Sequence, residues 1–452
     1  MRKVVSKNFL LFCVGVFFFW PNNANAQLNT VFSNVFDEIL ARRLDTTGVV
    51  SVHGRHFFPA AALANSELTP ALNSLVSSNV SSFPLSSTSV GVTFDFSTGL
   101  PVSITESMGP IFAETGRTLG KGKFNVGVNY SYLNLSTFRG LATEDMRFTF
   151  THQDVPPLGD TLGAANSNES DLIDVTMGMR VRASIFALFA TFGVLNGLDI
   201  GVAVPVVNIS LKGTAVATIN SYTYARLGLA NHHFGIGTDP YNPILETRVP
   251  YNQSATGLGD IALRLKYSVL RSADVDIAAL LDVRLATGKK EDFLGTGKTN
   301  FRLSGIISRK IADFTPHLNV AYERRTADFE SDQFVYAAGF DNKVLSGLTF
   351  AFAVLGQVSL NNDKTIKLFP GTATVIDLPG TSASPPAGSR SVRDVQLSNI
   401  PDRSNDNQTS ASFGFRFAPS ERVIFLGNIL IPLNDGGLRA SVAPTVGVSI
   451  SL

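Results

Sequence analysis

Residues 258–286, LGDIALRLKYSVLRSADVDIAALLDVRLA, alternate between apolar and polar side chains, and this stretch decides the fold class. In its first half the apolar residues stand at odd positions and the polar residues at even positions, as in Leu263-Arg264-Leu265-Lys266-Tyr267. After a turn near Arg271-Ser272 the same alternation resumes, as in Leu281-Asp282-Val283-Arg284. A repeat of two residues is that of a β-strand and not of a helix. The stretch therefore predicts a β-hairpin with one apolar and one polar face.

The charges of this hairpin lie almost entirely on one face. Seven of its eight charged residues stand at even positions, and the eighth, Arg271, is in the turn. An Arg or Lys that faced lipid at the middle of a membrane would cost about 2–4 kcal/mol. If the hairpin crosses a membrane, its odd positions therefore face the apolar medium and its even positions face a polar interior.

The composition leaves two classes of protein open. Charged residues make up 16% of the chain, against about 25% in soluble domains. After residue 26 no uninterrupted apolar stretch reaches the roughly 18 residues of a membrane-spanning helix. Such a chain is either a large soluble β protein or a membrane barrel, in which only half of each strand is apolar.

Twelve segments of the chain show strand-like alternation. They are 123–136, 171–193, 198–211, 258–270, 273–286, 299–309, 314–325, 333–341, 346–360, 410–418, 422–431 and 440–452. Most are at least as long as the about 9–11 residues that a tilted strand needs to cross the hydrocarbon. The segment 171–193 is longer, and its alternation changes phase near Arg182. We therefore predict an all-β fold, a transmembrane antiparallel β-barrel of about 12 strands, with 14 as the alternative.

The links between these segments alternate in length. Short links follow the even-numbered segments, at 194–197, 271–272, 310–313, 341–345 and 419–421. Longer links follow the odd-numbered segments, at 137–170, 212–257, 287–298, 326–332, 361–409 and 432–439. Membrane barrels have short periplasmic turns and longer outer loops, whereas a soluble sandwich has no reason to sort its loops in this way. The pattern favours the membrane barrel.

The first 26 residues have the features of a secretory signal peptide. Basic residues at 2, 3 and 7 precede an apolar run over 9–20, and Ala24-Asn25-Ala26 is a small-residue cleavage site. We expect cleavage after Ala26, with an uncleaved anchor as the alternative. The protein is then exported, and the barrel belongs in the outer membrane of a Gram-negative bacterium.

Removal of this segment changes the composition of the mature chain. Lys+Arg falls from 37 to 34 while Asp+Glu stays at 36, so the net charge becomes −2. This balance gives no indication of nucleic acid as a partner. The only cysteine, Cys13, also lies in the segment. The mature chain can therefore form neither a disulfide nor a thiolate metal site.

The chain ends inside a strand pattern. Val446, Val448, Ile450 and Leu452 alternate with small or polar residues. A last strand that pairs with the first leaves no free edge, which a membrane barrel requires. We expect this strand to act as the C-terminal assembly strand, with the barrel assembly machinery as its partner.

Residues 27–122 follow a different pattern from the barrel, which we assign to 123–452. The apolar residues of 31–40 have helical spacing, a second helix is expected near 66–78, and Val90 to Phe96 alternates as one short strand. Three placements of this block stay open. It is a plug inside the lumen, a periplasmic segment, or the source of two more strands.

Two motifs resemble binding sites but are better explained as loops. Gly295-Thr296-Gly297-Lys298-Thr299 looks like the end of a phosphate-binding loop, but Asp292 stands where that loop needs its first glycine. The pair His232-His233 cannot easily face one metal together and lacks further ligands, so we expect both to be surface residues. The nucleophile motif G-x-S-x-G does not occur. We predict no catalytic residue, no metal and no cofactor, and hence no enzyme, although a Ser/His pair assembled across strands stays open.

The inward-facing charges are the candidate lining of the lumen. They are Arg180, Arg182, Arg264, Lys266, Asp274, Asp276, Asp282 and Arg284. Buried charges are normally paired whatever the protein does. These residues therefore either contact a substrate or form a structural network of paired charges.

A series of short stretches carries a resemblance to known proteins. The stretches are 109–114 (GPIFAE), 118–125 (TLGKGKFN), 257–261 (GLGDI), 266–267 (KY), 285–288 (LATG), 294–297 (LGTG) and 316–319 (PHLN). In this order and spacing they resemble a family of bacterial outer-membrane transporters of the phenol-degradation MetA pathway. The resemblance implies a barrel distantly like the long-chain fatty-acid transporters, which moves small apolar or aromatic compounds inward. Such barrels usually end in Phe or Trp, whereas this chain ends in Leu452.

Two functions of different classes fit these observations. The first is an outer-membrane channel for uptake of small apolar or aromatic molecules, with outer-membrane lipid and a small hydrophobic solute as partners. Twelve strands lie between the about eight of filled barrels and the about 16–18 of water-filled porins, which suits a narrow lumen. The second is a surface barrel without transport, an adhesin or structural protein, that displays the loops 212–257 and 361–409. An apolar lumen with a continuous path would favour the channel, and a lumen blocked by paired charges would favour the surface protein.

Overall fold

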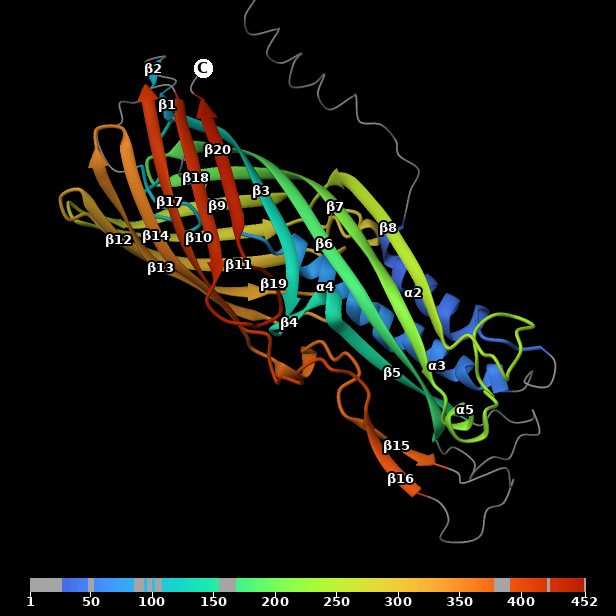
Figure 1. Ribbon diagram of the computed structural model, residues 1–452. Coiled ribbons are helices and arrows are strands. Elements are labelled where there is room, and N and C mark those ends of the chain that lie inside the picture. The colour runs from blue at the N-terminus through green and yellow to red at the C-terminus, as the bar shows by residue number, and fades with distance from the viewer. Residues whose placement is uncertain are drawn as a thin grey trace, which may run out of the picture.

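The computed structural model describes residues 27–47, 53–84, 93–95, 100–101, 108–153, 168–377, 391–420 and 423–450 (Figure 1). Within these ranges, twelve strands close into an antiparallel barrel, and the N-terminal segment contains helices. This confirms the predicted fold class and the count of twelve rather than fourteen. The predicted signal peptide with its cleavage site at Ala24 and Ala26 lies outside the described residues, as does Leu452.

The barrel wall uses the same twelve segments that the alternation predicted. Its strands are β3 (Lys123–Phe138), β6 (Asn168–Leu195), β7 (Leu198–Asn220), β9 (Ala262–Arg271), β10 (Val275–Arg284), β11 (Asn300–Arg309), β12 (Phe314–Arg324), β13 (Gln333–Leu345), β14 (Leu348–Ser359), β17 (Gln408–Ser420), β18 (Val423–Pro432) and β20 (Ala443–Ile450). The last of them, β20, pairs with β3, where Val446 lies opposite Tyr130. This pairing closes the ring and leaves no strand edge inside the membrane region.

The outer face of the wall is apolar, whereas buried charged side chains of β9 and β10 lie on the inner face. In β9, Leu265 is 42% exposed, whereas the next residue, Lys266, is 3% exposed. Exposed apolar side chains form a band around the wall, which includes Phe186, Leu188, Leu263, Leu303, Leu318, Val320, Phe350, Phe413, Phe415 and Phe425. A contiguous apolar surface of this extent is that of a membrane-embedded protein. Among the described helices, none is long and apolar enough to cross a membrane.

The strands β6 and β7 continue beyond the wall at the end with the long connections (Figure 1). There β5 (Met146–Gln153) pairs with β6, and β8 (Glu246–Leu258) pairs with β7. The four strands form a sheet above the barrel, which we call the extension. The predicted links 137–170 and 212–257 therefore contain strands, which the alternation of buried Met146, Phe148 and Phe150 could have indicated.

Three helices cover the inner face of the extension. They are α2 (Val31–Asp37), α3 (Phe58–Leu63) and α4 (Thr69–Ser81), connected by short 3-10 or π turns, and together we call them the cap. The ring of Phe36 lies 6.4 Å from Phe148 and 5.8 Å from Phe150 of β5. The helices expected near 31–43 and 66–78 are confirmed, and α3 is an addition.

Polar contacts of the residues after α2 also attach the cap to β8 and to the connection that precedes it. The Arg43 guanidinium donates to the Thr247 hydroxyl at 2.8 Å. The Asp45 carboxylate accepts from the Gly237 N–H at 2.9 Å. Burial raises the pKa of Asp45, but the hydrogen bonds from Thr47 and Gly237 outweigh this and hold the pKa below its usual value. Packing and polar contacts thus fix the cap at the long-connection end.

Several short elements complete the described structure. β1 (Thr93–Asp95) pairs with β2 (Leu100–Pro101) and with the start of β3 at the short-turn end, so β1 accounts for the described part of the strand expected over 90–96. The others are β4 (Leu141–Ala142), α5 (Tyr222–Leu227), the hairpin of β15 (Thr372–Asp377) and β16 (Ser391–Gln396), and β19 (Leu438–Ala440).

We expect Phe36→Ala to loosen the cap without opening the barrel. Phe36 is fully buried, and removal of a buried Phe ring costs about 3–5 kcal/mol. Limited proteolysis of the refolded protein should cut the cap of this variant first, while the heat-modifiable gel mobility of the barrel stays unchanged. Phe58→Ala, at a cap position that is 41% exposed, is the matched control. Equal protease resistance of both variants would contradict the packing described here.

Candidate functional site

Residues 108–119, which we call the plug segment, lie inside the barrel against its wall. Their main-chain N–H groups donate to wall side chains, from Met108 to Thr349 (3.2 Å), from Glu114 to Asn319 (2.7 Å), from Gly116 to Ser308 (2.9 Å) and from Leu119 to Asp199 (2.8 Å). These partners belong in turn to β14, β12, β11 and β7. The plug segment therefore crosses the strands of the wall instead of adding a strand to it.

The plug segment approaches the wall most closely at Gly116. A Cβ atom at this position would lie 2.4 Å from the carbonyl oxygen of Asp276, so no larger residue fits without moving the backbone. The neighbouring Arg117 forms an ion pair with the Asp276 carboxylate at 2.8 Å. Glycine is thus required by the close packing of the plug segment on β10.

Glu114 is the central charge of the plug segment. Its carboxylate lies 3.1 Å from Lys266 Nζ and 3.7 Å from Arg264, both of β9. Arg264 in turn forms an ion pair with Asp282 of β10 at 2.9 Å. All four side chains are buried. Buried charges need such partners, so Glu114 ties the plug segment to an ionic network on the inner wall.

The structure brings five of the eight predicted lining residues together inside the barrel. Arg264, Lys266, Asp276 and Asp282 take part in the contacts above, and Arg284 donates to the Ser81 carbonyl of α4 at 2.5 Å. The predicted network of paired charges accounts for most of these contacts. The sequence did not identify Glu114 as their partner, although Glu114 lies within the stretch 109–114 that carries the family resemblance.

The placement of Arg180 and Arg182 inside the lumen is wrong. Both side chains are exposed on the outer face of β6, and Arg180 pairs there with Glu144 at 2.7 Å. The alternation of β6 does not change phase, because its odd-numbered residues stay buried from 171 to 191. The apolar face of β6 differs between its two parts. In the extension the apolar side chains point inward, beneath the cap, and the outer face carries charged side chains in water. In the wall the outer face is apolar and meets lipid.

The placement of Asp274 in the lumen is also wrong. β9 ends at Arg271 and β10 begins at Val275, so Asp274 lies in the exposed turn between them. The alternation of the sequence continues through this turn and gives no sign of where pairing stops. The lumen instead contains further charges that the prediction omitted, among them the Arg302–Glu323 pair and the fully buried Arg416, which donates to the carbonyls of Met108 and Pro110.

A cavity of about 200 Å³ lies between the plug segment, the C-terminal end of α4 and the wall. Its apolar lining residues are Phe83, Phe112, Leu133, Leu135, Leu280, Ile306, Leu355, Leu430 and Leu438. Its charged lining residues are Glu114, Arg264, Asp282, Arg284, Arg302 and Arg439. The cavity can therefore hold a small apolar molecule beside a charged wall.

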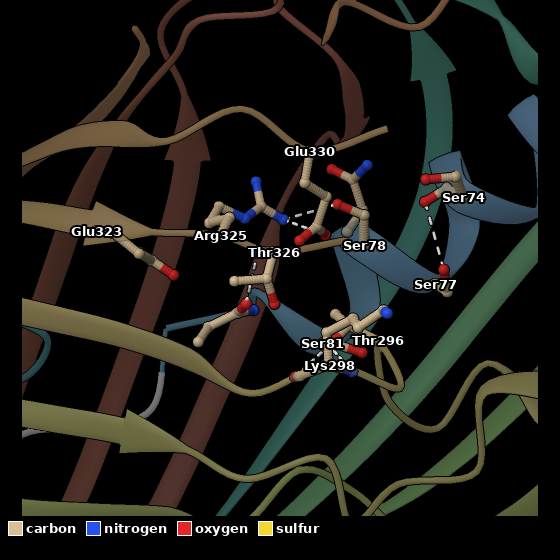
Figure 2. Close-up of polar contacts among 12 residues, drawn as sticks. Ser74, Ser77, Ser78, Ser81, Thr296, Lys298, Glu323, Arg325, Thr326 and Glu330 are labelled. Atoms are coloured by element: carbon tan, nitrogen blue, oxygen red, sulfur yellow. Dashed lines mark hydrogen bonds and ion pairs between the residues drawn. The ribbon is translucent and has the colours of Figure 1, made fainter. Parts of the chain in front are cut away.

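The end of α4 and the residues after it line this cavity on the long-connection side. Figure 2 shows Arg325, which follows β12, turned toward the end of this helix. Its guanidinium donates to the Ser78 hydroxyl at 2.9 Å and forms an ion pair with Glu330. Among the described residues, the cavity thus lies between the end of α4 and the plug segment.

The two loop motifs have structural roles. Asp260 accepts from the main-chain N–H groups of Gly288 and Thr296 at 3.0 Å each, so a carboxylate of the chain already occupies the glycine-rich loop. The expectation that His232 and His233 are surface residues is wrong. Both are buried beneath the cap, where His232 Nδ1 lies 2.7 Å from Asp171. Within the described ranges, no group of three His, Cys, Asp or Glu side chains is arranged to hold a metal.

Comparisons with known proteins give only remote similarities. No protein-family model matches the chain, and no curated protein is similar to it, so the family resemblance seen in the sequence stays a prediction. The solved COG4313 outer membrane channel from Pseudomonas putida F1 is 9% identical with a TM-score of 0.37, over 75% of this chain and 98% of that chain. The TodX monoaromatic hydrocarbon channel, a deltaS2 mutant, is 10% identical with a TM-score of 0.33, over 75% and 91%. A FadL homologue of Pseudomonas aeruginosa is 10% identical with a TM-score of 0.31, over 72% and 89%. These similarities are too low to transfer a function.

We expect Glu114→Ala to release the plug segment. The substitution leaves Lys266 buried without its carboxylate, and breaking a buried ion pair costs about 3–5 kcal/mol. At about 1.4 kcal/mol per factor of ten, amide hydrogen exchange of a peptide over 108–119 should become at least about 100-fold faster.

Glu144→Ala is the matched control, because Glu144 is 56% exposed in its pair with Arg180. An exposed pair contributes about 0–1 kcal/mol, so exchange over 108–119 should stay as in the unmodified protein. Unchanged exchange in Glu114→Ala would show that the ionic network does not hold the plug segment.

Proposed function

We propose that the protein is an outer-membrane channel for uptake of small apolar or aromatic molecules. The observation that carries the proposal is the cavity of about 200 Å³ between the cap and the plug segment. An empty cavity of roughly 150 Å³ with an apolar lining is enough to bind benzene. The volume and the row of Phe and Leu side chains therefore suit one small aromatic molecule.

The membrane location rests on the barrel itself. Its apolar outer face needs lipid, and barrels of this architecture, with short turns at one end and long connections at the other, belong to bacterial outer membranes. A cleaved signal peptide over 1–26 would deliver the chain there, and the assembly machinery would then recognise β20. We assign the long-connection end, with the cap and the extension, to the cell exterior.

The nature of the contacts explains how such a channel stays closed without solute. The plug segment is attached to the wall by single hydrogen bonds and ion pairs and not by a strand ladder. The five inward residues Arg264, Lys266, Asp276, Asp282 and Arg284 would then act as the holding surface for the plug segment and the cap. Displacement of the plug segment would join the cavity to the short-turn end.

A surface protein without transport is the second candidate. It is favoured by the paired charges along the inner wall and by the extension and the hairpin of β15 and β16, which project beyond the wall (Figure 1). In this case the network would only fill the interior. The two candidates differ in whether the lumen conducts.

We expect the refolded mature protein to conduct rarely in a planar bilayer, and Glu114→Ala to open more often. Because an apolar solute carries no current, uptake of toluene into vesicles is measured in parallel. Glu144→Ala should behave as the unmodified protein in both assays. Conductance and toluene uptake at the level of protein-free membranes, for all three proteins, would overturn the channel and leave the surface protein.

Filling the cavity should block solute without disturbing the wall. Ala321 of β12 lines the cavity and is 7% exposed, whereas the adjacent Val320 faces lipid and is 40% exposed. We expect Ala321→Phe to abolish toluene uptake and Val320→Phe to leave it unchanged, with heat-modifiable mobility retained by both. Normal uptake by Ala321→Phe would exclude the cavity from the solute path.

A further inference from the structure

Three basic side chains gather on the outer face of β6 and β7. Arg180 lies directly opposite Lys212 in the strand register, and Arg182 lies opposite Ser210. All three side chains are exposed. We call Arg180, Arg182 and Lys212 the outer basic patch. It takes no part in the lumen or in the proposed transport.

The height of the outer basic patch follows from the register. The apolar band on these strands ends at the cross-strand pair of Phe186 and Val206, and the polar pair of Ser184 and Asn208 comes next. Arg182 stands four positions beyond Phe186, which is about 13 Å along the strand and about 10 Å along the membrane normal at a tilt near 40°. Headgroups add about 5–7 Å to each side of the hydrocarbon, and an Arg side chain can lean toward them. The guanidinium therefore reaches the headgroup layer.

A tyrosine marks the same boundary on the neighbouring strand. Tyr130 of β3 is 42% exposed, and its hydroxyl lies 3.0 Å from the Ser184 hydroxyl. Tyrosine is enriched where the hydrocarbon meets the headgroups, because its ring is apolar and its hydroxyl polar. Its position agrees with a boundary between Phe186 and Arg182.

The outer basic patch has more positive than negative charge. Arg180 pairs with Glu144, but Arg182 and Lys212 have no ion-pair partner among the described residues. At the corresponding end of β12, by contrast, the exposed Arg324 is paired with Asp332 at 2.8 Å. The outer basic patch therefore places two exposed cations at the level of the lipid headgroups, where they can bind an anion.

We propose that the outer basic patch binds the phosphate groups of a lipid in the outer leaflet. Arg182 and Lys212 would contact the phosphates, and the acyl chains would lie against Phe186 and Leu188, which are 47% and 37% exposed directly below. This pairing of cations with an apolar surface fits an amphiphile better than a free anion. The inference rests on the proposed placement of the barrel in an outer membrane, but not on transport.

The test measures binding of diphosphoryl lipid A to the refolded mature chain in detergent by native mass spectrometry. The variants are Arg182→Gln, Lys212→Gln and the double variant. Each basic residue near a charged membrane surface contributes about fivefold to binding, so we expect about fivefold weaker binding for each single variant and about 30-fold for the double variant. Arg271→Gln, an exposed cation at the short-turn end, is the matched control and should bind as the unmodified protein.

Two further arms separate lipid binding from misfolding and from binding of a free anion. Arg182→Lys keeps the positive charge and should retain binding. Retained binding in this variant would show that the loss in Arg182→Gln comes from the lost charge and not from misfolding. Excess inorganic phosphate should not displace the lipid if the acyl chains contribute. The proposal is overturned if the double variant binds lipid A within twofold of the unmodified protein, if Arg271→Gln loses as much binding, or if phosphate alone displaces the lipid. Because no step measures conductance, its failure is distinguishable from failure of the proposed channel.

Discussion

No backbone N–H or C=O group can stay unpaired in hydrocarbon, and the rest of the structure depends on this constraint. The wall satisfies it by pairing β20 with β3, so every strand in the apolar band has two neighbours. Beyond the band the constraint ends. There β5 and β8 pair with β6 and β7, the other edge of β5 is bridged within the described ranges only at Phe148 to Ser398, and helices can pack on the sheet. The strands β6 and β7 thus form part of the wall within the lipid, and beyond it they form the sheet on which the cap packs.

The sequence predicted the wall well because alternation reports strand geometry directly. In β9 and β10 one face is apolar and the other charged, and this correctly assigned Lys266 and Asp282 to the interior, where both are buried. Alternation does not report which medium each face meets. In the extension the inner face of β6 is apolar because it shares a hydrophobic core with the cap, so the assumption that charges point inward failed for Arg180 and Arg182. To assign the two faces of a strand from its pattern, one must therefore also know which elements pack on each face.

The candidate site was predictable only in part for a related reason. Charges on neighbouring strands could be grouped from the register of a hairpin, but Glu114 reaches Lys266 from a segment 152 positions earlier. No local pattern marks such a partner. The cavity is harder still, because its walls are contributed by α4, the plug segment and strands from most of the barrel. Its existence depends on packing between elements and not on the character of any one of them.

The position of the plug segment constrains the order of assembly. α4 lies at the long-connection end, the plug segment lies within the ring, and β3 begins at the short-turn end, so described parts of the N-terminal segment lie at both ends of the barrel that the later part of the chain forms. A chain segment cannot enter a closed ring of hydrogen-bonded strands through its wall. The cap and the plug segment must therefore reach their places before β20 pairs with β3, because this last pairing closes the ring around the plug segment. Pairing of the final strand thus completes both the wall and the enclosure of the plug segment.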